Sequence, residues 1–538
     1  MADAPLTLFN SLTRKLEPFQ PVHEGEARVY TCGPTVYNYP HIGNMRAYVF
    51  ADVLGRALSF KGYKLSHVIN ITDVGHLTDD ADDGEDKMEK MAAQQAQSIW
   101  QIAEHYKQAY WADVSALNIR GPMNSGTPSA AHWTVATDYV PQMIEFAKGI
   151  ADRHCYELDS GLYFDVSTVA DYGRLARAQT DEGEGRIEAV EGKRNAADFA
   201  IWRKTPPGEK RQMEWESPWG RGAPGWHLEC SVMSGAVLGF PFDIHTGGID
   251  HREIHHPNEI AQNQAHCCTN GLDDAANSGA RLWMHNNFLV ERSGKMSKSS
   301  GEFLRLQLLI DKGYHPLAYR MMCLQAHYRS ELEFSWEGLQ AALTRLKRMV
   351  MACETLKARH AELGSASIEQ PEPAEKAEEW TLKQVQGDDS KPLMAILGTA
   401  KDIAPAYFSG VFPPKLLALV DKFDAAISDD LNTPVALTVL EEVLATKKID
   451  VGLKRTVVEA MDAVLGLGLL DLKRTDFRIR PKSATITEAE IEGALEKRKQ
   501  ARAEKDFATS DAIRDELAAQ GVVVMDGDPL GWEWKLGD

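Results

Sequence analysis

A strand, a turn rich in glycine and proline, and a helix follow one another near the start of the chain, and this order constrains the fold most strongly. Residues 27–30 have the pattern of a short strand, 31–44 form the turn TCGPTVYNYPHIGN, and 45–60 carry apolar residues at helical spacing. Open α/β sheets bind nucleotides outside the carboxyl ends of their strands, where such turns lie. Gly43 would let a phosphate reach the N–H groups and positive dipole end of the first helical turn. The stretch therefore predicts an α/β fold with a nucleotide site.

The size and composition of the chain predict a multidomain protein without membrane spans or disulfides. At 538 residues it is too long for one core, so we expect three or four domains. The amino terminus lacks a basic-then-apolar leader, and no apolar run approaches membrane-spanning length, which predicts a cytoplasmic location. Seven cysteines are too few and too scattered for a disulfide framework. The net charge of −19 argues mildly against nucleic acid as a partner, although local basic clusters can override that total.

Changes in periodicity divide the chain into six segments. We expect the α/β domain in two halves, at 1–114 and 224–290, separated by an insertion at 115–223. A connecting region at 291–335 should follow, then a helical bundle at 336–470 and a small α+β unit at 485–538. Within the insertion, residues 128–152 carry one apolar face and predict a helix. Residues 361–392 are rich in Glu, Ala, Gln and Pro with weak periodicity, which predicts a flexible insert.

Four residues of the types that bind zinc lie near predicted strand–helix junctions. Cys32 and Cys230 each lie at such a junction, and His255 and Glu259 are four residues apart, so a helix places them on one face. Two thiolates, an imidazole and a carboxylate can form a tetrahedral zinc site. From spacing alone, two buried thiols and a helical His/Glu pair are the better explanation of these residues, because the chain has no Cys-x-x-Cys.

A second polar motif lies far downstream of the first turn. Residues 295–299 read KMSKS, and in this order HIGN at 41–44 and KMSKS resemble the two signature motifs of class I aminoacyl-tRNA synthetases. The first motif departs from the usual HIGH at Asn44. An amide can donate a hydrogen bond but cannot carry a positive charge, so the substitution is expected to affect the reaction rate.

Within that class the chain resembles the cysteinyl-tRNA synthetase family. The matching stretches are Cys32 nine residues before His41, GWHLEC at 225–230 and HHPNE at 255–259, and further matches cover nearly the whole chain outside 361–392. Pro257 stands where the family usually has Glu. The resemblance implies one zinc ion per chain, with these ligands: Cys32, Cys230, His255 and Glu259. It also implies that zinc selects the thiolate of L-cysteine over the hydroxyl of serine, so that no editing domain is needed.

The resemblance further implies a fold and a set of site residues. The implied fold is a class I synthetase Rossmann-like parallel sheet with an insertion domain, followed by an α-helical bundle and a small C-terminal α+β domain. The catalytic residues it implies are His41, Asn44, Lys295 and Lys298. The residues it implies for ATP binding are His41, Gly43, Asn44, Gly247, Gly248, Asp250 and Lys298. Thr72 and Trp226 match positions lining the cysteine pocket, although an N-cap threonine and a core tryptophan remain open alternatives.

By the same resemblance, the chain would activate L-cysteine with ATP and Mg²⁺ and transfer it to tRNA(Cys), as a monomer. Trp532 and Trp534 of the last segment could stack on bases or lie in a core. A cysteine ligase acting on an amino sugar would share the zinc site and the ATP motifs, but it should lack the long carboxy-terminal modules. A catalytically silent zinc- or RNA-binding relative is the third reading, and the retained His41 and KMSKS loop argue against it.

Overall fold

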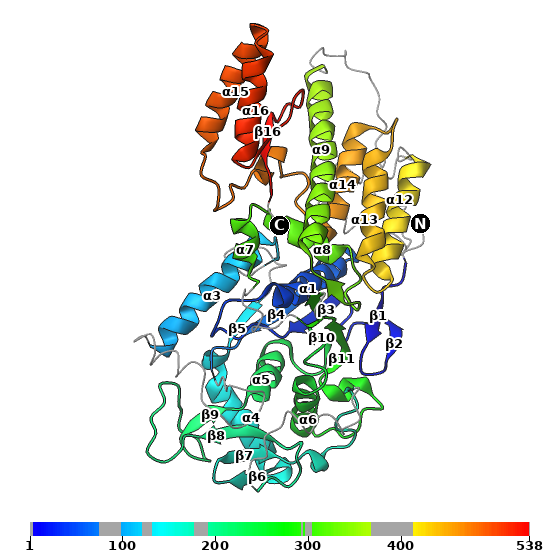
Figure 1. The fold of residues 1–538 in the computed structure, drawn as a ribbon. Helices are drawn as coiled ribbons and strands as arrows, with labels where there is room; N and C mark the ends of the chain where they lie inside the picture. The colour runs from blue at the N-terminus through cyan, green and yellow to red at the C-terminus, as the bar shows by residue number, and fades with distance from the viewer. Residues whose placement is uncertain are drawn as a thin grey trace.

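Five parallel strands form the central sheet of the computed structural model, which describes residues 4–74, 98–120, 132–176, 192–291, 294–295, 304–366 and 413–536 (Figure 1). Their order across the sheet is β11, β10, β3, β4, β5. The strands are β3 (Glu26–Thr31), β4 (Lys64–Ile71), β5 (His132–Val135), β10 (Phe242–Gly248) and β11 (Ala280–Asn286). Because all five run parallel, their carboxyl ends meet at one edge of the sheet, where such folds bind ligands. The α/β prediction is confirmed.

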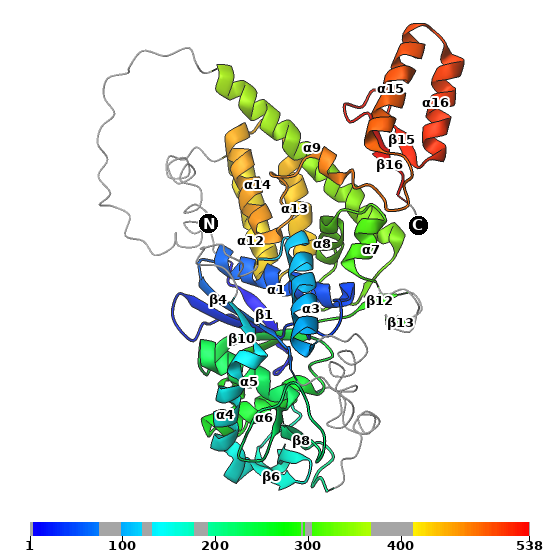
Figure 2. The same ribbon diagram turned by 90° about the vertical axis from the view of Figure 1, so that its left-hand side faces the viewer.

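Helices cover both faces of this sheet. Helix α1 (Ile42–Phe60) lies on one face, and α5 (Trp226–Leu238) and α6 (His255–Cys267) lie on the other (Figures 1 and 2). Sheets covered on both sides need strands that are apolar throughout, and Val29, Tyr30, Val68 and Ile71 are all fully buried. Helix α1 begins at Ile42, within the stretch 41–44 where the first helical turn is predicted, and His41 caps it.

Residues 132–135 form a strand, where the sequence predicted part of a helix over 128–152. They pair with β4 as the edge strand β5, although the predicted insertion begins at residue 115. Trp133, Thr134 and Val135 are aromatic or β-branched and suit a strand. The helix that follows, α4 (Val140–His154), starts at a proline in its first turn, Pro141, which favours a start there. Residues 121–131 and 75–97 lie outside the described part of the chain.

A four-stranded antiparallel sheet follows α4 and lies beyond α5 and α6 (Figure 1). Its strands are β6 (Cys155–Leu158), β7 (Gly161–Phe164), β8 (Phe199–Lys204) and β9 (Gly222–Pro224). Strand β9 leads directly to Gly225 and α5, so the chain returns from this sheet to the central domain at the second predicted half. An antiparallel sheet with its own small aromatic cluster, Tyr156 and Tyr163, is the expected form of an inserted unit.

A helical region covers the α1 side of the central sheet (Figure 1). Its helices are α3 (Ile99–Ala116), α7 (Leu306–Asp311), α8 (Pro316–Leu324), α9 (Trp336–Ala366), α12 (Pro414–Ser428), α13 (Thr433–Ala445) and α14 (Val451–Leu465). Helix α9 runs to Ala366, so the first six residues of the predicted flexible insert are helical. The remainder of that insert, 367–392, lies outside the described residues.

The last unit carries α15 (Glu488–Ala503), α16 (Phe507–Ala519) and the hairpin of β15 (Val522–Val524) with β16 (Trp532–Trp534). Trp532 and Trp534 are buried, at 2% and 6% exposure, and pack edge to face against each other. Their rings therefore form the core of this unit, and the alternative that they stack on bases is wrong.

Two further small sheets lie outside the central sheet and the insertion. Strands β1 (Thr7–Asn10) and β2 (Lys15–Pro18) form a hairpin, and β12 (Leu289–Glu291) pairs with both β13 (Gly294–Lys295) and β14 (Leu332–Glu333). None of the helices described is long and apolar enough to cross a membrane.

A buried ionic junction ties α1 to the helical bundle. The Asp52 carboxylate of α1 accepts hydrogen bonds from Arg320 of α8 at 2.6 Å and Arg56 at 2.7 Å. Arg320 is fully buried and also donates to the carbonyl oxygens of Leu117 at 3.0 Å and Leu465 at 2.8 Å. Leu465 ends α14, so the arginine stabilises carbonyl groups that a helix end leaves without partners. One side chain thus joins three helices to α1.

Candidate functional site

The turn between β3 and α1 is closed by a reciprocal pair of hydrogen bonds. His41 is the N-cap of α1: its Nδ1 accepts from the Gly43 N–H at 3.0 Å, and the Asn44 Oδ1 accepts from the His41 N–H at 3.3 Å. This is a capping box built from histidine and asparagine. Since Nδ1 is the acceptor, a neutral His41 ring carries its proton on Nε2, where it can donate to an anion. Asn44, the predicted departure from the motif, holds the backbone of the catalytic histidine candidate.

Replacing Asn44 by alanine should loosen the first turn of α1. The variant loses the acceptor for the His41 N–H, so the free energy of unfolding should fall by about 1 kcal/mol. Asn44→Gln is the matched control, because glutamine at this third helical position also closes a capping box. Urea unfolding measures both variants, and equal stability of Asn44→Ala and Asn44→Gln would contradict this role.

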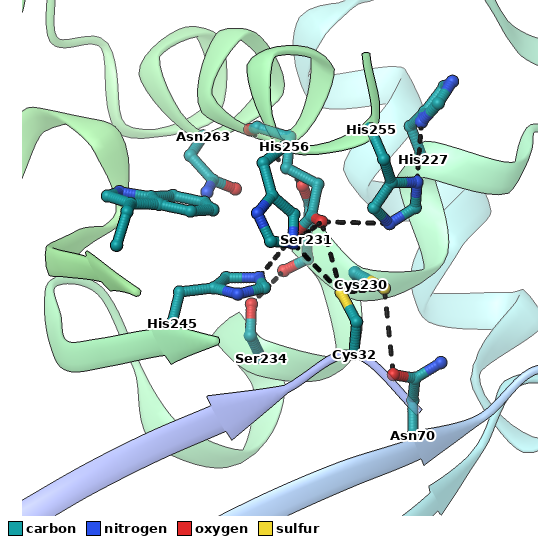
Figure 3. Close-up of polar contacts among 12 residues, drawn as sticks. Cys32, Asn70, His227, Cys230, Ser231, Ser234, His245, His255, His256 and Asn263 are labelled. Atoms are coloured by element: carbon teal, nitrogen blue, oxygen red, sulfur yellow. Dashed lines mark hydrogen bonds and ion pairs between the residues drawn. The ribbon is translucent and has the colours of Figure 1, made fainter. Parts of the chain in front are cut away.

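The four predicted zinc ligands converge in the interior. Cys32 follows β3, Cys230 lies on α5, and His255 and Glu259 lie on α6; one donor atom from each falls within 4.8 Å of the others (Figure 3). The Cys32 Sγ lies 3.9 Å from the Cys230 Sγ and 3.8 Å from Glu259 Oε1, and His255 Nε2 lies 3.0 Å from that oxygen. All four residues are buried.

Burial and mutual contact set the charges of this cluster. Burial raises the pKa of the Cys32 thiol well above its ordinary value, whereas the hydrogen bond from Cys32 lowers the pKa of Cys230 to about 6. Burial lowers the pKa of His255, but Cys230 and Glu259 outweigh it and raise that pKa to about 10. Burial raises the pKa of Glu259, but His245 and His255 together lower it to about 2. These shifts favour the thiolate form of Cys230 and the carboxylate form of Glu259, the charged forms that a divalent cation binds.

The distances suit zinc. In a tetrahedral site with zinc–sulfur bonds of about 2.3 Å, the two sulfur atoms are about 3.8 Å apart. The observed separation of the Cys32 and Cys230 sulfur atoms is 3.9 Å. A second set of donors overlaps the first, with His245 and His256 in place of Cys230 and His255. The first set contains both cysteine sulfur atoms, which are the softer donors, and it therefore fits zinc better.

Neighbouring side chains orient these ligands. His245 Nε2 lies 2.9 Å from Glu259 Oε2 and donates to it, because a carboxylate only accepts; this turns Oε1 towards the thiols. His227 Nδ1 lies 2.9 Å from His255 Nδ1, which leaves Nε2 of His255 facing Glu259. His256 lies 3.3 Å from the Cys32 sulfur (Figure 3). Such partners fix ligand orientation in metal sites.

The two residues predicted to line the cysteine pocket, Thr72 and Trp226, come from different elements of the fold. Thr72 continues β4, forms a parallel bridge to Thr35 and accepts from the Asn70 amide at 2.8 Å. It is therefore an extended strand residue and not an N-cap. Trp226, the first residue of α5, is half-buried, and the centre of its ring lies 4.5 Å from that of the His255 ring, so it lies next to a predicted zinc ligand and outside the main hydrophobic core.

Gly247 and Gly248 end β10 at the carboxyl edge of the sheet. A Cβ atom on Gly247 would lie 2.8 Å from His251 Nδ1 and 2.8 Å from His256 Cε1, and one on Gly248 would lie 2.3 Å from Asp250 Oδ1. Gly247 therefore leaves no room for a side chain beside the buried His256 ring, whereas the exposed Asp250 side chain could move aside for one at Gly248. Lys295 lies in β13, paired with Val290, whereas Lys298 lies outside the described residues.

Sequence reasoning missed several residues of the site. Four of them contact the predicted ligands directly: Asn70, His227, His245 and His256. The fifth, His285, contacts His256 and so supports the site from behind. A usable signal was present, because four histidines fall within residues 245–256, at a strand end and the next helix start. Such a density of one titratable residue type around a predicted ligand marks a site.

Comparisons with known proteins identify the family. The model of the class I (C) tRNA synthetase catalytic domain matches residues 18–344, and that of the cysteinyl-tRNA ligase anticodon binding domain matches residues 487–529. A cysteine–tRNA ligase of Novosphingobium aromaticivorans is 73% identical over 99% of this chain and 97% of its own. The cysteine–tRNA ligase of Zymomonas mobilis is 51% identical over 99% and 98%, and that of Thermus thermophilus is 36% identical over 99% of each.

The family match spans the described elements that form the site, from Cys32 after β3 to the α6 ligands, and it extends to the anticodon binding domain of the last unit. Over this length and at these identities, the chain belongs to the cysteine–tRNA ligase family of class I tRNA synthetases.

Proposed function

We propose that this protein activates L-cysteine with ATP and transfers it to tRNA(Cys). The observation that carries the proposal is the buried cluster of Cys32, Cys230, His255 and Glu259, set at the carboxyl edge of the sheet, where Cys32 begins the turn that leads to His41. A sulfur-rich cluster selects a thiol substrate, and a helix N-terminus binds phosphate. The carboxylate of cysteine would attack the α-phosphate of ATP, releasing pyrophosphate; the tRNA ribose would then attack the adenylate.

His41, Asn44 and Gly43 would act on the phosphates. His41 donates from Nε2, the N–H groups of the first turn of α1 point towards the anion, and Asn44 keeps the turn closed. Lys298 and Lys295 would neutralise the leaving phosphates, with Mg²⁺ bound to ATP. Gly247, Gly248 and Asp250 would form the adenosine-binding turn. In this scheme the protein positions groups and stabilises charge, and it forms no covalent bond with the substrate.

The cluster would hold one zinc ion, whose chemistry when bound is that of a Lewis acid able to take a thiolate as a further ligand. Thr72 and Trp226 would bound the space in which the cysteine lies. A purely apolar pocket discriminates close analogues by only about 1–3 kcal/mol, so a thiolate-selective site removes the need for editing against serine. Within the donor set, His245 orients Glu259 and His227 orients His255.

The remaining assignments follow from the same proposal. The bundle at 336–470 and the unit at 485–538 would contact the anticodon side of tRNA(Cys), the insertion would lie between the two halves of the catalytic domain, and the enzyme would act as a monomer. We assign it to the cytoplasm, where its seven free thiols would stay reduced.

Transfer of labelled cysteine to bulk tRNA, with ATP and Mg²⁺, tests the proposal. Charging with cysteine and not with serine is the expected result. Cysteine-dependent pyrophosphate exchange without charging of tRNA would instead favour the ligase that acts on an amino sugar. Absence of both activities would favour the silent relative.

Deletion of residues 367–392 should leave charging within about twofold of the full chain, because a low-complexity segment contributes little to a packed core. The deletion begins after the end of α9, so that helix is kept whole. Charging kinetics with tRNA measure the effect, and a loss of tenfold or more would show that this segment takes part in the reaction.

A further inference from the structure

A cation–π contact holds the turn that leads to His41. The guanidinium carbon of Arg305, the residue before α7, lies 3.4 Å from the centre of the Tyr39 ring. Helix α3 supports the same ring: the Tyr39 hydroxyl lies 3.0 Å from His105 Nε2, and Tyr106 packs against the ring at 5.0 Å, edge to face. Tyr39 is therefore held between α3 and the start of α7.

The backbone of the turn is fastened to the same side. The Ile42 N–H donates to the Leu304 carbonyl at 2.9 Å, and the Tyr319 hydroxyl of α8 donates to the Ile42 carbonyl at 2.6 Å. Leu304 directly precedes Arg305. The two residues therefore contact Ile42 and Tyr39, which flank Pro40 and His41 on either side. The residues between are stiff, since Pro40 has a fixed φ and restricts the backbone of Tyr39 before it. A displacement of the Tyr39 ring is thus passed to His41.

We propose that Tyr39 and Arg305 are positioning residues for His41: their contact sets where the histidine meets the phosphates. This inference rests on the proposed function, because it requires His41 to act on ATP. Neither residue belongs to the two signature motifs, and their contacts given above are with the turn, α3 and each other and not with Cys32, Cys230, His255 or Glu259. The contact is therefore expected to affect the chemical step and not the binding of cysteine.

The expected signature is a loss of kcat with an unchanged KM. In cysteine-dependent pyrophosphate exchange, Tyr39→Leu and Arg305→Gln should each lower kcat about fivefold, as expected for loss of one partly exposed cation–π contact. The KM for cysteine should stay within about twofold, because the thiol cluster is untouched. Tyr39→Phe keeps the ring and should retain nearly all of kcat. The double variant should lose no more than either single one, because both remove the same contact.

Lys107→Gln is the matched control. It removes another cation–π contact of α3, that of Lys107 with Trp111 at 5.4 Å, which involves neither Tyr39 nor Arg305, and it should leave kcat unchanged. Thermal melting of every variant checks that the fold is kept, and Arg305→Lys, which keeps the charge, should restore part of kcat.

Three outcomes would overturn the inference. Wild-type kcat in both single variants is the first. Additive losses in the double variant are the second. The third is a raised KM for ATP in Arg305→Gln with no effect of Tyr39→Leu, which would mean that the arginine binds a phosphate itself. If the unaltered protein catalyses no exchange, the proposed function fails first, so the two failures are distinguishable.

Discussion

Replacement of Cys230 by serine should abolish zinc binding and cysteine-dependent pyrophosphate exchange together. Cys230 is the cluster's thiolate, with its pKa lowered to about 6 by the hydrogen bond from Cys32. A serine hydroxyl stays protonated at neutral pH and is a poor ligand. Loss of a residue that merely orients a ligand costs about 10- to 100-fold in metal affinity, so loss of a ligand should cost at least about 100-fold.

Zinc content per chain and competition with a chelator measure the affinity, and exchange with cysteine and with serine measures the function. Cys267→Ser is the matched control, because Cys267 is an exposed thiol at the end of the same helix as His255 and Glu259. The control should bind zinc normally. A Cys230→Ser protein that keeps one tightly bound zinc and normal exchange would show that the overlapping donor set with His245 and His256 holds the metal.

The second large effect is expected from Arg320→Gln, which should lower the free energy of unfolding by about 3–5 kcal/mol. The change leaves the buried Asp52 carboxylate with fewer cationic partners and removes the donors to the Leu117 and Leu465 carbonyls. Burial raises the pKa of Asp52, but Arg56, Arg320 and Arg120 lower it well below its ordinary value of 3.8. Because the folded pKa is the lower one, this stabilisation is complete above pH 3.8 and is lost as the pH falls towards the folded value.

Urea unfolding at neutral pH and at acid pH tests this prediction, and the difference between wild type and variant should narrow in acid. Arg174→Gln serves as the control, because Arg174 forms exposed ion pairs with Asp171 and Asp273. Exposed pairs contribute about 0–1 kcal/mol, so the control should be nearly neutral. Equal free energies of unfolding for Arg320→Gln and Arg174→Gln would mean that the buried contacts of Arg320 do not stabilise the fold.

The sequence predicted those parts of the molecule that depend on local pattern. The order strand, turn, helix gave α1 and the nucleotide edge, and the four-residue spacing placed His255 and Glu259 on one face of α6. Local pattern failed at residues 132–135, because the partner that makes them a strand is β4, some sixty residues earlier. Their apolar face alone could not distinguish the two structures.

The rest of the site depends on packing between distant elements. His245 lies on β10 and contacts Glu259 on α6, and His285 on β11 contacts His256 on α6. Because each pair joins two different elements, no periodicity in the sequence predicts either contact. The two cysteines could be joined to the cluster only by resemblance to a family. The tryptophans of the hairpin show the same limit, because only the packing of α15 and α16 against β16 decides that their rings are buried.

The ionic junction at Asp52 fixes the middle of α1, whereas His41 lies at the N-terminus of the same helix. With a rise of about 1.5 Å per residue, the eleven steps along α1 from His41 to Asp52 span about 16.5 Å. A tilt of about 3° of this segment at the junction would therefore swing its far end by about 0.9 Å, close to the misplacement of about 1 Å that can cost a hundredfold in rate. Under the proposed function, a small rotation of the helical bundle would therefore displace His41 relative to the phosphates, so the contacts of Arg320 with Asp52 and Leu465 would also keep the catalytic turn in place.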